Sequence, residues 1–268
     1  MFIWKNKGEF KYLEIDSFSK MGIKAFFTSR QGGVSEGVFN SLNLGLHTSD
    51  NNNKVIMNRK ILAKNLNIDF ASLTSAKQVH GNNVYIVKDK EKGKGSLEYK
   101  NSIENTDALL TKSKDITLFS YYADCVPLYF YDLENEIIGL AHAGWKGTLK
   151  KISLKVLEKL KNNFASNLNN CLVAIGPSIS KEYYEVDERI INKFEEEFDY
   201  LDEFIVYKGK DRYLLDLPGL NKIMLIKAGI LIKNIDLSNI CTFSESDNFY
   251  SYRRDKGKTG RMASIITF

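Results

Sequence analysis

The chain has 268 residues and a formal net charge of +5, with 43% hydrophobic and 26% charged residues. This mixture is typical of a globular domain with a sizeable core, and it excludes a chain that is disordered, collagen-like or coiled-coil throughout. No run of about eighteen apolar residues occurs, and the first residues lack the pattern of a secretory signal, so we expect neither a membrane span nor export.

In the first half of the chain, short apolar patterns alternate with long polar segments. Residues 24–28 predict a strand, which leads into a loop rich in Gly, Ser and Asn. Asp50 or Asn51 is a suitable N-cap for a following helix, whose apolar residues recur near helical spacing. Residues 83–88 predict a second strand, and the polar residues 89–105 predict an exposed loop.

The second half carries denser strand and helix patterns. Three strands are predicted at 116–121, 128–132 and 136–141, and a helix begins near Thr148. Further elements are predicted as strands at 171–175, 204–207, 213–217, 240–243 and 262–268, and as helices at 187–198 and 218–229. Because helices do not separate the strands regularly, we expect one α+β domain over residues 1–268, with mixed β-sheets covered by helices.

The cysteines indicate the cellular compartment, and the lysines bear on possible nucleic-acid partners. Three cysteines form an odd and sparse set, which does not indicate a disulfide framework and favours a cytoplasmic protein. The lysines are scattered among Glu and Asn without interleaved aromatic residues. They therefore indicate solvated surfaces, and we expect no nucleic-acid partner.

Three residues of metal-binding types, His80, Cys125 and His142, lie at or just beyond predicted strand ends. Two imidazoles and a thiolate suit zinc, and three protein ligands leave a fourth position open for water or substrate. The gaps between the residues are long, so spacing alone favours structural histidines and a buried thiol. A Cys–His nucleophile, with Cys125 beside Asp124, is a further interpretation.

Two segments carry groups that attract anions. In AHAGWKGT, glycines and Lys146 precede a predicted helix, whose free N–H groups favour negative charge, although a tight strand-to-helix turn explains the segment equally well. Arg253, Arg254 and Arg261 are three of the seven arginines and fall within the last sixteen residues. Their planar donors suit phosphate or carboxylate, and a solvated hairpin is the alternative.

Many longer segments share their order with one protein family. They are TSRQGGVSEGVFNSLNLGLHTSDN, Asn58–Arg59, QVHGNNV, TDALLT, YYADCVPLYFYD, AHAGWKGT, AIGPSISKEYYEV, DLPGLNKIMLIKAGI and FYSYRRDKGKTGRMASII. On these segments the chain resembles the laccase-domain, or YfiH-type, family over nearly its whole length. That family is also labelled purine nucleoside phosphorylase, polyphenol oxidase and peptidoglycan editing factor.

The resemblance implies a fold, a metal site and an activity. It implies a single α+β domain and assigns the metal ligands to His80, Cys125 and His142, which we also expect to be catalytic. The metal is expected to be Zn²⁺, with Cu²⁺ as the alternative. The implied reactions are phosphorolysis of adenosine, inosine and methylthioadenosine, and deamination of adenosine. The substrates would then be purine nucleosides and inorganic phosphate.

A phosphorylase must also hold a phosphate dianion beside the purine. We expect this contact from residues that face the metal pocket, namely Arg30, Asn43, Arg59, Lys146, Arg253 and Arg254. Arg59 is the weaker candidate, because only the Asn–Arg pair of the resemblance supports it.

The other family labels predict different chemistry. A multicopper laccase needs many imidazole ligands, and the chain has three histidines in all, so at most a single-copper polyphenol oxidase is compatible with this sequence. A metal- or cysteine-dependent amidase that edits a peptidoglycan precursor fits the same three residues. A non-enzymatic binding module is the third alternative, and an open metal site argues against it.

Overall fold

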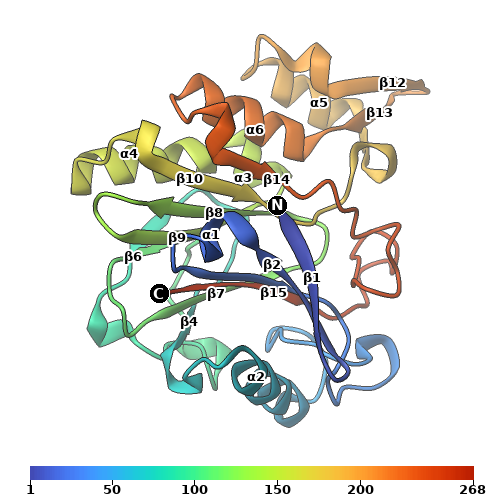
Figure 1. Cartoon of the computed structure of the whole chain (residues 1–268). Coiled ribbons are helices and arrows are strands. Elements are labelled where there is room, and N and C mark those ends of the chain that lie inside the picture. The colour runs from blue at the N-terminus through green and yellow to red at the C-terminus, as the bar shows by residue number, and fades with distance from the viewer.

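The strands at the centre of the molecule bury side chains on both faces. In β8 (Val126–Asp132), Leu128 and Phe130 pack into one apolar cluster, whereas Tyr129 and Tyr131 pack into another. This two-residue alternation places β8 between two covering layers. The computed structural model describes all 268 residues and consists of two stacked sheets with helices on both outer faces (Figure 1).

The first sheet is mixed and has six strands in the order β1-β2-β3-β15-β7-β4. Their bounds are β1 Phe2–Lys7, β2 Phe10–Ile15, β3 Lys24–Thr28, β15 Met262–Thr267, β7 Thr117–Tyr122 and β4 Leu73–Ser75. Neighbours run antiparallel except β4 and β7, which are parallel. The last strand of the chain therefore lies inside the sheet, between β3 and β7.

The second sheet is also mixed, in the order β14-β10-β8-β9-β6-β5. Besides β8, its strands are β14 Ile235–Leu237, β10 Cys171–Ile175, β9 Ile137–Ala143, β6 Ala108–Thr111 and β5 Val84–Ile86. The pairs β10–β14 and β5–β6 are parallel, and the others are antiparallel. Leu109, Leu140 and Tyr129 of this sheet meet Leu118 and Ile266 of the first sheet in the buried layer between them.

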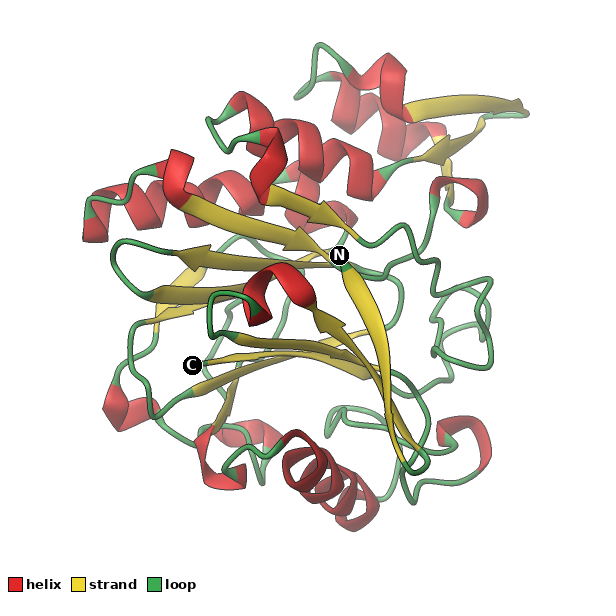
Figure 2. Cartoon of the chain, in the orientation of Figure 1, coloured by secondary structure: helices red, strands yellow, loops and turns green.

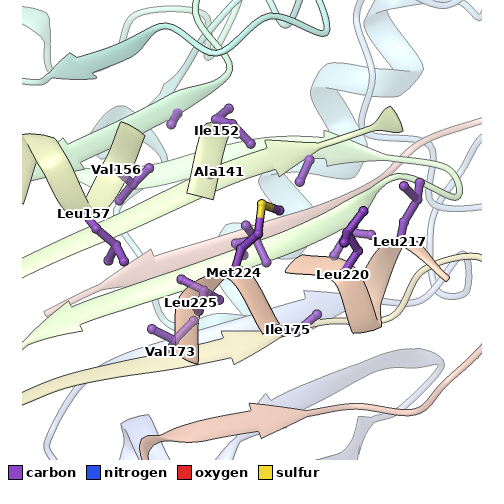
Figure 3. Packing of buried hydrophobic residues seen from close by; sticks show 14 of the residues in the cluster. Ala141, Ile152, Val156, Leu157, Val173, Ile175, Leu217, Leu220, Met224 and Leu225 are labelled. Carbon is purple, nitrogen blue, oxygen red and sulfur yellow. The ribbon is translucent and has the colours of Figure 1, made fainter. Parts of the chain in front are cut away.

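Helices cover the outer face of each sheet (Figure 2). The helix α2 (Asn52–Leu66) packs Leu62 and Leu66 on the first sheet. On the second sheet lie α3 (Trp145–Leu149), α4 (Ile152–Phe164) and α6 (Leu217–Lys227), whose apolar side chains meet Val173 and Ile175 of β10 (Figure 3).

Three smaller features complete the fold. A short helix α1 (Asp16–Ser19) follows β2. A three-stranded sheet, β11-β13-β12 (Glu185–Asp187, Arg212–Leu215 and Ile205–Gly209), adjoins α5 (Glu188–Glu195). None of the helices combines the length and the apolar character that crossing a membrane requires.

The α+β class is confirmed, and most predicted elements are present within a few residues. The predicted helix from Thr148 is wrong in one respect. It is two helices, α3 and α4, because Lys151 adopts a left-handed φ of 57°. The predicted strand at 240–243 is absent, and Cys241 forms only an isolated bridge with Ser178. The strands β1, β2, β4, β6, β11 and β14 were not anticipated.

The segment 89–105 is irregular, as predicted, but it is not simply exposed. Glu91, Ser96 and Ser102 are buried, and the carbonyl oxygens of Gly95 and Ser96 accept hydrogen bonds from a buried arginine. Its polar residues therefore pair with protein groups as well as with water.

Candidate active site

The structure brings His80, Cys125 and His142 together. The register of β8 and β9 pairs Pro127 with His142, which places Cys125, just before β8, at the same sheet edge. His80 reaches this edge from the segment between β4 and β5. One ligand atom from each residue lies within 4.8 Å of the others, a spacing that allows all three to bind one metal ion.

A buried carboxylate, Asp107, fixes two of these residues. The pairing of β6 with β9 sets Asp107 beside His142, whose Nδ1 lies 2.9 Å from Asp107 Oδ1. The same carboxylate accepts the backbone N–H groups of Val79, His80 and Gly81. A carboxylate only accepts, so Nδ1 of His142 carries the proton and Nε2 is the nitrogen left for a metal.

The charges of Cys125 and His142 are coupled. Burial opposes ionisation of the thiol, but the imidazoles of His142 and His80 outweigh burial and lower the pKa of Cys125. Burial also disfavours the imidazolium of His142, but Cys125 and Asp107 outweigh it and raise the pKa of His142. The thiolate form of cysteine is the one that binds zinc, and the donor set of two imidazoles and a thiolate fits a zinc ion.

The backbone around these residues is tightly constrained. Asp124 has a φ of 88° and His80 has a φ of 58°. Both angles are positive, and residues other than glycine rarely adopt a positive φ. A Cβ on Gly144 would lie 2.9 Å from Cys125 Sγ, so only glycine leaves room for the cysteine there. Strained residues of this kind cluster at functional sites.

Asp124 connects the sheet edge that carries the candidate metal ligands to the C-terminal loop. Its carboxylate accepts hydrogen bonds from Thr242 Oγ1, Ser251 Oγ and the backbone N–H of Arg253. The Asp124 side chain therefore anchors the segment that carries Arg253.

A cavity of about 470 Å³ opens at the three donor residues, and its size suits a small organic ligand. One part of its wall is aromatic, where the His47 ring packs against Tyr99 and Tyr121. Another part is apolar and includes Ile179 and Leu217. Two cationic side chains, Arg253 and Arg261, also line the cavity.

Of the six predicted phosphate-binding residues, the structure brings only Arg253 to this cavity. Arg30 stacks on Tyr250, and its Nε donates to the carbonyl oxygen of Asn40. Lys146 is exposed and lies against the Trp145 ring. Neither Arg30 nor Lys146 belongs to the cavity wall.

The other three predicted residues hold the protein together instead. Asn43 is buried and accepts the backbone N–H of Arg261. Arg59 is fully buried and donates to backbone carbonyl groups and to the Tyr121 hydroxyl. Arg254 donates to the carbonyl oxygens of three loop residues and to Asp255.

The cavity also contains residues that the sequence prediction missed. His47 is one of only three histidines, and Asp107 stands in the TDALLT segment, so both had a weak signal in the sequence. The sequence groups Arg261 with Arg253 and Arg254, but the predicted phosphate contacts do not include it. Burial with Arg261 and Arg59 nearby lowers the pKa of His47 to about 3, so this imidazole is neutral at pH 7.

Fold and site together define an α+β domain with a candidate His–Cys–His metal centre at the edge of two stacked sheets. The family model described as multi-copper polyphenol oxidoreductase laccase matches residues 24–268, and the chain belongs to this family. The family resemblance stated from the sequence is thereby confirmed.

Relatives and solved structures cover nearly the whole chain. "Purine nucleoside phosphorylase YlmD" of Bacillus subtilis (strain 168) is 41% identical over 242 residues, which cover 90% of this chain and 87% of that protein. The structure of YlmD from Geobacillus stearothermophilus has a TM-score of 0.94 at 32% identity, covering 100% of this chain and 99% of that one. The structure of the Bacillus licheniformis hypothetical protein YfiH also has a TM-score of 0.94, at 35% identity, and covers 99% of this chain and 98% of that one.

Proposed function

We propose that this protein is a cytoplasmic, zinc-dependent purine nucleoside phosphorylase. Its proposed substrates are inorganic phosphate with adenosine, inosine or methylthioadenosine, and the same site is proposed to deaminate adenosine. The names of several relatives support the phosphorylase activity. The observation that carries the proposal is the convergence of His80, Cys125 and His142 on a cavity of ligand size.

In this proposal, His80, Cys125 and His142 hold the ion, and Asp107 fixes the ring of His142. A zinc ion bound by three protein ligands supplies a Lewis acid and activates water at neutral pH. The Cys125 thiolate and the Nε2 atom of His142 would be donors to the ion. The proton on Nδ1 stays on the side of Asp107, so the orientation of the imidazole persists through the reaction.

Arg253 is the proposed phosphate contact. Its Nη1 donates to the carbonyl oxygen of Glu185 at 2.7 Å, and its guanidinium lies over the Tyr184 ring. These two contacts hold the side chain at the cavity wall and leave other N–H donors for an anion.

A second candidate function uses the proximity of Cys125 and His142, whose donor atoms lie within 4.8 Å of each other. The pKa of Cys125 is lowered and that of His142 is raised, which favours a thiolate next to an imidazolium, the pairing that cysteine nucleophiles use. Such a pair could cleave an amide, for example in a peptidoglycan precursor, without a metal ion. Two imidazoles and a thiolate also suit a single copper ion, so a single-copper oxidase is the third candidate.

The test is a panel of nucleosides, incubated with and without phosphate and analysed by chromatography of the products. We expect free base and ribose 1-phosphate only when phosphate is present, and conversion of adenosine to inosine in either case. Cys125→Ala or His142→Ala should abolish both reactions. Cys241→Ala is the matched control, because Cys241 is a half-buried thiol outside the donor group.

Three results decide between the candidates. Phosphorolysis that survives in Cys125→Ala would rule out the metal site as the reaction centre. Full activity after removal of zinc by a chelator would favour the cysteine nucleophile. Phenol oxidation that depends on added copper, without any nucleoside turnover, would favour the oxidase.

A further inference from the structure

The arginines of this protein differ in how many of their N–H donors already have partners. A guanidinium has five such donors. In Arg59, Nε and Nη2 donate to the Leu44 carbonyl oxygen, Nη2 also to the Tyr121 hydroxyl, and Nη1 to two further carbonyl oxygens. Arg254 is equally saturated by Asp255 and by backbone oxygens. Neither side chain has a donor free for a ligand.

Arg261 is different. Only its Nη1 is paired, with the carbonyl oxygens of Thr259 and Gly260, so Nε and Nη2 have no partner. No carboxylate forms an ion pair with it, and the side chain is partly buried against the cavity. The free edge of the guanidinium, Nε–H together with Nη2, is the fork that binds two oxygen atoms of one phosphate.

The surroundings of Arg261 compensate its charge only in part. Burial lowers the pKa of Arg261, although the charges of Cys125 and Asp124 act in the opposite direction. The oxygens of Asp124 already accept three hydrogen bonds from the C-terminal loop, and the nearby His47 imidazole is neutral at pH 7. A partly desolvated cation that forms no ion pair costs stability unless an anion binds to it.

The position of Arg261 is built into the fold. Its backbone N–H donates to the buried Oδ1 of Asn43, and its guanidinium lies over the Tyr252 ring at 5.6 Å. Arg261 directly precedes β15, a central strand of the first sheet. The charge is therefore held at the cavity by a rigid strand, whereas Arg253 is held by a loop.

We propose that Arg261 binds the phosphate group of the substrate through Nε and Nη2, in the cavity that Arg253 also lines. This proposal rests on the proposed phosphorylase function, which makes inorganic phosphate the expected source of the group. The 5′-phosphate of a nucleotide has the same chemistry, and the experiment separates the two sources.

The experiment compares Arg261→Gln and Arg261→Lys with Arg212→Gln. Arg212 is an exposed arginine on β13, so its substitution removes the same charge without reaching the cavity. For each zinc-loaded protein, calorimetry gives the dissociation constant of inorganic phosphate and, separately, of inosine 5′-monophosphate. Steady-state kinetics give the KM values for phosphate and inosine.

We expect Arg261→Gln to weaken phosphate binding about ten-fold or more, as loss of charge-assisted hydrogen bonds requires. The KM for inosine should stay within about two-fold, since the nucleoside would make no ionic contact with this side chain. Arg261→Lys keeps the charge and loses the fork, so its phosphate affinity should fall between the other two. Arg212→Gln should match the unsubstituted protein, and unchanged zinc content would show that each variant is folded.

The outcomes separate the hypotheses. Equal phosphate affinity in Arg261→Gln and Arg212→Gln overturns the proposal. A rise confined to the KM for inosine also overturns it, because that result would assign Arg261 to the purine. Weakened binding of inosine 5′-monophosphate, with no binding of inorganic phosphate to any protein, supports the site with a nucleotide as the source. If phosphate binds through Arg261 but no nucleoside is cleaved, the proposed function fails and the anion site remains.

Discussion

Asp107→Asn is the sharpest single perturbation of the candidate metal centre. Oδ1 of Asp107 faces two donors, His142 Nδ1 and the His80 N–H, and Oδ2 faces the N–H groups of Val79 and Gly81. An asparagine of the same shape must turn its NH₂ group toward one of these pairs. With the NH₂ group toward the first pair, the His80 N–H loses its acceptor, and His142 must carry its proton on Nε2, the nitrogen needed for a metal. With the NH₂ group toward the second pair, the N–H groups of Val79 and Gly81 both face a donor.

The expected loss is in metal affinity as well as in stability. Loss of a carboxylate behind a ligating histidine typically weakens metal binding about 10- to 100-fold, or about 1.4 to 2.7 kcal/mol. Each buried N–H group left without an acceptor costs about 1–3 kcal/mol of folding stability in addition. Because both His80 and His142 depend on this carboxylate, we expect the upper part of the affinity range.

Zinc affinity is measured by competition with a chelator, and stability by urea unfolding of the zinc-free protein. Asp132→Asn is the matched control, since Asp132 is a fully buried carboxylate that accepts N–H groups of Glu134 and Asn135 at the far end of β8. It should lose stability without losing zinc affinity. Equal zinc affinity in the two variants would refute the role of Asp107.

Two further predictions concern neighbouring residues. Gly144→Ala should weaken zinc binding in the same competition assay, because the added Cβ would lie 2.9 Å from Cys125 Sγ and 3.0 Å from His80 Cδ2. The φ of Gly144 is −70°, which suits alanine, so the effect would come from these contacts and not from backbone strain. Unchanged zinc affinity would mean that the ligands can shift. In an NMR titration of the three imidazoles, His47 should remain neutral down to about pH 4, because its pKa is lowered to about 3. The unfolded chain takes up this proton near pH 6.5, so the free energy of unfolding falls as the pH drops from 6.5 toward 3. His47→Gln has no such proton to take up, so its free energy of unfolding should fall less over the same pH range than that of the natural chain. A His47 titration near pH 6 would contradict this environment.

The sequence predicted the three candidate metal ligands, which the structure brings together, and the central strands, because their signals are local. Long buried strands such as β8 and β9 have apolar residues on both faces. Cys125 and His142 stand in recognisable segments at the ends of these strands, and His80 stands in another such segment between β4 and β5. The order of the strands was not predictable in the same way. That β15 is inserted between β3 and β7 depends on contacts across most of the chain.

The missed strands have a common physical reason. β1 is an edge strand whose side chains are half-buried or exposed, so it lacks a clear alternating pattern. β4 and β14 have three residues each, too few to show any period. The segment 240–243 has strand-forming residues, but only Cys241 finds a bridging partner, Ser178, so propensity alone gave the wrong result.

The sequence did not show which arginines line the cavity, for a different reason. Arg253 and Arg254 are adjacent in the sequence and chemically identical, yet one lines the cavity and the other has every donor paired. Which of two neighbouring arginines is free depends on where the carbonyl groups of distant loops lie. That information exists only in the folded chain.

The same comparison explains why the segments that carry the resemblance contain so many polar residues that never reach the cavity. Arg59 joins the loop at Leu44 to the Tyr121 hydroxyl. Asp124, the residue directly before Cys125, holds the C-terminal loop through Ser251 and Arg253. Buried backbone groups in long loops need such partners, since no regular secondary structure supplies them. The loops that form the cavity are thus held by polar side chains whose donors are paired, whereas Arg253 and Arg261, which line the cavity, keep N–H donors without partners. Unpaired donors in the folded chain, and not residue type alone, therefore select the candidates for a ligand contact.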